Sequence, residues 1–153
     1  TGTHGRGVWV VDIAPLRDLS AEIAEQDFHL FQPEDAILWR MTSRGYTGNR
    51  YYRAANPAYG ASIYLYLAAD QDEPPVVTIH DITGKELAKL EGREHRGIQR
   101  LQWDARQGNR LAAPGTYSAR IEVGEEQQAR AFQLHADPGT QPNDNPNTQA
   151  QRR

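Results

Sequence analysis

The chain has 153 residues, enough for one domain with a hydrophobic core, and a formal net charge of -3. Because 17 Lys and Arg face 20 Asp and Glu, no basic excess indicates a nucleic-acid partner, and no apolar run is long enough for membrane insertion. The absence of cysteine excludes disulfides and thiolate metal sites.

The first predicted element is a strand over residues 5–13, where apolar side chains occupy both faces. A strand of this kind needs cover on both sides, and its natural partners are missing from the sequence that follows. We therefore expect residues 1–14 to be the last strand of an upstream domain. Because the chain opens on Thr1 rather than Met, we also expect a segment of a longer polypeptide, with any targeting signal upstream.

Residues 15–35 are predicted to form a connector with one short helix. Ser20 is a suitable N-cap, Glu22 would lie in the first turn, and Ile23 would supply the apolar contact. We expect large apolar side chains to attach this connector to both neighbouring domains. They are Leu16, Leu19, Phe28, Leu30 and Phe31.

Residues 36–137 are predicted to form an all-β sandwich. Its clearest unit is a hairpin over residues 76–90, in which Asp81 starts the turn and Gly84 permits a positive φ. Apolar alternation predicts further strands at residues 36–41, 61–68, 97–104, 117–123 and 132–134. The total is about seven or eight strands, as expected for a sandwich.

The side chains predicted to face the core are apolar residues on one face of each strand. They are Ile63, Leu65, Leu67, Val77, Ile79, Leu101, Trp103, Tyr117, Ala119, Ile121, Val123, Phe132 and Leu134. The last stretch, residues 138–153, contains Pro, Asn, Gln, Thr and Arg without apolar anchors. It is predicted to be a disordered tail.

Two parts of the sequence resemble known families. The residues that carry the first resemblance are THGRGVWVVDIAPLR at 3–17, NRYY at 49–52 and NPAYGA at 56–61. This part resembles the exit from the last blade of sortilin-type, BNR-repeat-like β-propellers. Those propellers occur in exported bacterial proteins often labelled glycosyl hydrolases. The residues that carry the second resemblance are VTIHD at 77–81, GK at 84–85, WD at 103–104 and PGTY at 114–117. The second half is similar to the Ig-like domain of flagellar hook-capping proteins and of bacterial C-terminal sorting modules.

The resemblance covers most of residues 3–137. It implies an Ig-like or fibronectin III-like sandwich, preceded by one orphan propeller strand and the connector. The propeller families take their catalytic groups from the propeller, so the resemblance transfers no catalytic residue to this chain.

The residues themselves do not indicate catalysis either. Glycoside hydrolysis needs two carboxylates facing each other across a cleft, whereas the candidate acidic residues are predicted in turns or at exposed strand positions. They are Asp70, Asp72, Glu73, Glu91, Glu94, Glu125 and Glu126. The histidines show no metal-ligand spacing, and they are His4, His29, His80, His95 and His135. We expect no metal, no cofactor and no enzymatic activity from this chain.

The candidate binding residues lie where tyrosine and arginine interleave. They are Trp39, Arg50, Tyr51, Tyr52, Arg53 and Tyr59. Aromatic rings stack on sugar faces and guanidinium groups grip carboxylate or sulfate, so one hypothesis is a site for an acidic polysaccharide. The same residue types are favoured at interfaces, so the other hypothesis is an attachment between the sandwich and an upstream domain.

The predicted function is therefore that of a non-catalytic C-terminal accessory domain. It would pack against an exported bacterial β-propeller, in the same polypeptide or in a companion chain, and stabilise it. The alternative is a carbohydrate-binding module, and a third class is an adhesion or sorting module. All three imply a secreted, periplasmic or cell-surface location.

Overall fold

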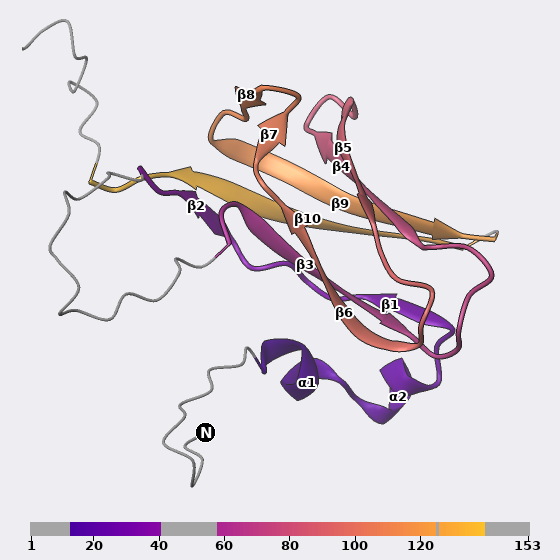
Figure 1. Ribbon diagram of the computed structural model, residues 1–153. Helices are drawn as coiled ribbons and strands as arrows, with labels where there is room; N and C mark the ends of the chain where they lie inside the picture. The colour runs from indigo at the N-terminus through magenta and orange to yellow at the C-terminus, as the bar shows by residue number, and fades with distance from the viewer. Residues whose placement is uncertain (1–12, 41–57, 125, 140–153) are drawn as a thin grey trace, which may run out of the picture.

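The computed structural model describes residues 13–40, 58–124 and 126–139. Two β-sheets dominate this part of the chain and lie one over the other (Figure 1). The smaller sheet has the order β1-β3-β6, with bounds Phe28–Leu30, Ala61–Leu67 and Gly97–Trp103. The larger has the order β2-β10-β9-β4-β5, with bounds Ala36–Leu38, Glu126–Ala136, Gly115–Val123, Val76–Asp81 and Glu86–Glu91. The predicted all-β class is confirmed.

One hydrophobic core lies between the sheets and receives side chains from both. In β3 the apolar residues Ile63, Leu65 and Leu67 are buried, while the residues between them are only half-buried. The same alternation buries Tyr117, Ala119 and Ile121 in β9, because successive side chains of a strand point to opposite faces. The sequence predicted these inward faces correctly.

The predicted hairpin is also present. β4 and β5 pair antiparallel, and Asp81 holds the turn between them. Its Oδ1 accepts bonds from the Thr83 amide at 2.8 Å, the Thr83 hydroxyl at 2.6 Å and the Lys85 amide at 3.0 Å. Gly84 has φ +82°, as the predicted turn requires. Asp81 therefore stabilises the turn by accepting three hydrogen bonds on one carboxylate oxygen.

Two short strands and two short helices complete the described elements. β7 (Arg106–Gln107) and β8 (Arg110–Leu111) form a small hairpin of their own. α2 (Ala21–Ala24) begins after Ser20, whose Oγ accepts the Ile23 amide at 3.2 Å, so the predicted cap is confirmed. α1 (Ala14–Asp18) was not predicted, and it begins with a proline in its first turn.

The segment predicted to be a connector, residues 15–35, contributes β1 to the smaller sheet and leads directly into β2 of the larger sheet. Phe28, Leu30 and Phe31 are at most 3% exposed and belong to the core of this domain, although the sequence suggested contacts with neighbouring domains. Phe28–Leu30 pairs antiparallel with β3, and Ala36–Leu38 then pairs parallel with β10. The stretch from Phe28 to Leu38, which we call the crossing segment, thus passes from one sheet to the other.

Some predictions fall on residues outside the described ranges. These include the strand predicted upstream of Ile13 and nearly all of the predicted tail. Ile13 itself lies just before α1 and is 53% exposed, and Ala14 is helical rather than part of a strand. β2 covers three of the six residues predicted for its strand, and Met41 lies outside the description.

Candidate functional site

A pocket of about 440 Å³ lies beside the crossing segment, and its size is within the range of ligand pockets. Three parts of the chain line it: α1, the crossing segment with Trp39, and the start of β3. The lining residues are Ala14, Pro15, Asp18, Phe31, Gln32, Glu34, Asp35, Ala36, Ile37, Trp39, Ala58, Tyr59, Gly60, Ala61, Ser62 and Tyr64. The elements in the pocket wall are therefore far apart in sequence.

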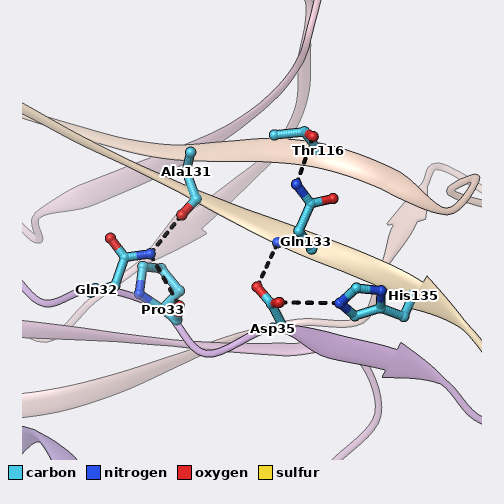
Figure 2. Close-up of polar contacts among 7 residues, drawn as sticks. All are labelled: Gln32, Pro33, Asp35, Thr116, Ala131, Gln133 and His135. Carbon is cyan, nitrogen blue, oxygen red and sulfur yellow. Dashed lines mark hydrogen bonds and ion pairs between the residues drawn. The ribbon is translucent and has the colours of Figure 1, made fainter.

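Hydrogen bonds to β10 fix the wall formed by the crossing segment (Figure 2). Asp35 Oδ1 accepts the Gln133 amide at 2.9 Å, and its Oδ2 accepts His135 Nε2 at 3.1 Å. Gln32 Nε2 donates to the Ala131 carbonyl at 2.6 Å. The bond from the Gln133 amide, followed by that from His135, lowers the pKa of Asp35, so this carboxylate stays ionised near neutral pH.

A second carboxylate holds the other end of β2. Asp137 Oδ2 accepts the Arg40 amide at 2.9 Å, and its Oδ1 accepts the Gly139 amide at 2.8 Å. These two backbone bonds, that from Arg40 first, lower the pKa of Asp137. The short strand is thus fastened before its first residue by Asp35 and after its last by Asp137.

The opposite wall depends on Gly60. Its φ is +91°, and a Cβ placed there would lie 1.9 Å from the Trp103 carbonyl oxygen. Only glycine permits this close approach of the chain to the end of β6. Tyr59 is held beside it, because its carbonyl accepts Gln102 Nε2 at 2.9 Å. Gln102 Oε1 in turn accepts the Ser62 hydroxyl at 2.8 Å.

The structure brings two of the predicted binding residues to this pocket. Trp39 is 51% exposed, and Tyr59 is half-buried and packs against the core. The other four, Arg50, Tyr51, Tyr52 and Arg53, lie outside the described residues. Trp39 and Tyr59 therefore share one pocket, and the ligand-binding role of the six residues stays a prediction.

Sequence reasoning missed the acidic part of the lining. Asp18, Glu34 and Asp35 all line the pocket, and no Lys, Arg or His is among its described lining residues. Asp18 and Glu34 are exposed, and within the described part of the chain neither carboxylate has a hydrogen-bond or ion-pair partner. A usable signal was the placement of Glu34 and Asp35 directly before a predicted strand.

Other candidate chemistry does not assemble in the described ranges. No group of three His, Asp or Glu side chains there is placed to hold a metal ion. Asp35 and His135 form a pair, but the imidazole contacts no nucleophilic side chain among the described hydrogen bonds. Asp70 accepts the Arg96 amide at 2.7 Å and so serves a loop. No helix among the described residues is long and apolar enough to cross a membrane.

Comparison with protein-family models gave no match, and a search of curated proteins also gave none.

Proposed function

We propose that this chain is a non-catalytic accessory domain that packs against a larger exported polypeptide, which the sequence resemblance suggests is a β-propeller. The docking face would comprise Ile13, Leu16 and Trp39 together with the pocket. Six large apolar residues are exposed within the described ranges. Of these, Trp39 lines the pocket, and Ile13 and Leu16 directly flank its lining residues Ala14 and Pro15 in the sequence. That gathering of exposed apolar side chains carries the proposal, because such patches mark interaction sites.

The arrangement of the strands supports an Ig-like assignment for the domain. The crossing segment contributes a strand to each sheet. The other strands are divided in a way that is similar to an immunoglobulin sandwich, with β3 and β6 in one sheet and β4, β9 and β10 in the other. Near the start of β9, the Tyr117 hydroxyl donates to the Ala113 carbonyl at 2.6 Å. This contact matches the tyrosine corner of Ig-like sandwiches.

The test uses the natural polypeptide that contains this chain, compared with a variant carrying Leu16→Asp. If the docking face packs against the rest of that polypeptide, the charge should separate one thermal unfolding transition into two. Ile82→Asp is the matched control, because Ile82 is 81% exposed on the distant β4–β5 turn. Identical unfolding profiles for the two variants would refute the docking role.

A second candidate function is carbohydrate binding, and the pairing of Trp39 with Tyr59 at one pocket favours it. The carboxylates of Asp18 and Glu34 accept hydrogen bonds from hydroxyl groups but repel anionic sugars. The described lining therefore suits a neutral glycan better than the acidic one that Arg50 and Arg53 suggested. Calorimetric titration with neutral and uronic-acid oligosaccharides distinguishes the two, and binding of the uronic acid alone would contradict this preference.

A further inference from the structure

The electrostatic character of the pocket points to one kind of occupant. Its three acidic lining residues have no cationic neighbour among the described lining residues. Asp35 already accepts hydrogen bonds from Gln133 and His135, and its negative charge remains at the pocket wall. The carboxylates of Asp18 and Glu34 are exposed and have no partner among the described residues, so they can accept hydrogen bonds from a ligand.

The aromatic lining complements these charges. Trp39, which is exposed, and Tyr59, which is half-buried, both line the pocket, and Phe31 is a buried part of the same lining. An aromatic face attracts a cation through its quadrupole, and a guanidinium group also stacks on it as a flat group. Acidic and aromatic side chains together therefore favour an arginine over a neutral or acidic group.

We propose that the pocket binds an arginine side chain from a basic segment of the partner polypeptide, between the rings of Trp39 and Tyr59 and against Asp18 and Glu34. This inference rests on the docking role proposed above and specifies the chemistry of the partner. A volume of about 440 Å³ accommodates an arginine side chain together with part of its neighbours. Ile13 and Leu16, which flank the lining residues Ala14 and Pro15 in the sequence and are exposed, would contact the backbone on either side of that arginine.

The test measures binding of the 153-residue chain to a fluorescent Gly-Arg-Gly-Arg-Gly peptide by anisotropy. A second peptide has citrulline in place of each arginine, which keeps the shape and removes the charge. We expect the arginine peptide to bind at least about tenfold more tightly and to weaken as salt is raised, because exposed charges are screened. Equal affinity for the two peptides would overturn the inference.

Paired variants locate the binding site. Asp18→Asn with Glu34→Gln should weaken arginine-peptide binding by about tenfold, and Trp39→Ala should also weaken it. The control, Asp72→Asn with Glu73→Gln, changes two exposed acids in a loop away from the pocket and should leave the affinity unchanged. Equal loss in both double variants would show a general charge effect and refute the site.

The outcomes also separate this inference from the docking role. If Leu16→Asp divides the unfolding transition but the arginine peptide does not bind, the docking role stands and the arginine pocket is wrong. If a neutral oligosaccharide binds and the peptide does not, the pocket is a sugar site and the inference is refuted. If the peptide binds but Leu16→Asp has no effect, the pocket serves a separate partner and the proposed docking against the parent polypeptide fails.

Discussion

Trp103 joins the two sheets through side-chain contacts. It belongs to β6 in the smaller sheet, is 1% exposed, and its ring centroid lies 5.1 Å from that of Tyr117 and 6.0 Å from that of Phe132. Both partners belong to the larger sheet. Its indole Nε1 donates to the Arg106 carbonyl at 3.1 Å, so the one polar atom of this side chain is satisfied.

Replacing Trp103 with alanine should lower the free energy of unfolding by about 3–5 kcal/mol, because it removes a buried aromatic ring and leaves a cavity. Trp39→Ala is the matched control, and since Trp39 is 51% exposed, its change should stay within about 0.5 kcal/mol. Urea unfolding followed by circular dichroism measures both. Similar losses in the two variants would contradict the burial argument.

At the scale of single elements, β1 depends on one side chain. Gln128 of β10 accepts the Leu30 amide on its Oε1 at 2.9 Å and donates from its Nε2 to the Phe28 carbonyl at 3.2 Å. The side-chain amide thereby supplies the acceptor and donor that a neighbouring strand would offer. It satisfies the backbone of a three-residue edge strand on the side facing away from β3.

Replacing Gln128 with alanine should therefore lower the free energy of unfolding by about 1–3 kcal/mol, because it leaves the polar backbone groups of Phe28 and Leu30 without partners. Faster amide exchange at Leu30 than at the central residues of β3 should accompany the loss. Gln127→Ala is the control, since Gln127 is exposed on the same strand. An unchanged Leu30 exchange rate would count against this role.

The elements that could be predicted were those with their own periodicity or turn chemistry. In the β4–β5 hairpin, apolar and polar residues alternate along β4, and the turn that follows begins at Asp81 and contains Gly84. These signals lie within a few residues of each other, so local sequence specifies the hairpin. β1 has only three residues, and its identity as a strand depends on β3 and on Gln128, about a hundred positions away. No local pattern carries that information.

The same reasoning explains why the sequence singled out, as candidate binding residues, only two of the residues that line the pocket. Trp39 and Tyr59 stood out because aromatic residues are uncommon outside cores and sites. Asp18 and Glu34 looked like ordinary surface acids, and only the fold places them beside those rings. The crossing segment brings α1, β2 and the start of β3 together, which is a property of topology rather than of spacing.

At the scale of the whole molecule, we expect the free energy of unfolding to decrease as the pH falls. The pKa values of Asp35, Asp81 and Asp137 are all lowered, chiefly by hydrogen bonds from the Gln133 amide, the Thr83 side chain and the Arg40 amide, respectively. A lowered carboxyl pKa means that the fold favours the ionised form. Its contribution to stability is present above the usual value of 3.8 and is lost as the pH falls through the lower folded value.

His29 acts in the same direction at higher pH. Burial, followed by the nearby charge of Arg130, lowers its pKa from the usual 6.5. The unfolded chain therefore binds this proton more readily than the folded one, and stability declines as the pH falls from 6.5 toward the folded pKa of His29.

We expect the urea midpoint to fall in two stages between about pH 7 and about pH 3, the upper stage from His29 and the lower from the three carboxylates. Substituting His29 with glutamine should flatten the upper stage, and Asp35→Asn should reduce the slope of the lower. Asp72→Asn serves as a control, because that carboxyl is exposed in a loop. A midpoint independent of pH over this range would contradict the argument.

The parallel pairing of β2 with β10 has a mechanical consequence. The N-terminal part of the chain joins β2 at the first residue of that strand, and the C-terminal part leaves β10 at its last residue. Because the two strands are parallel, these two points lie at opposite ends of the pair. Tension applied along the chain therefore draws the two strands past each other lengthwise. Their hydrogen bonds, with those of Asp35 and Asp137, share that load at once instead of opening one by one, so this pairing resists lengthwise separation of the two strands.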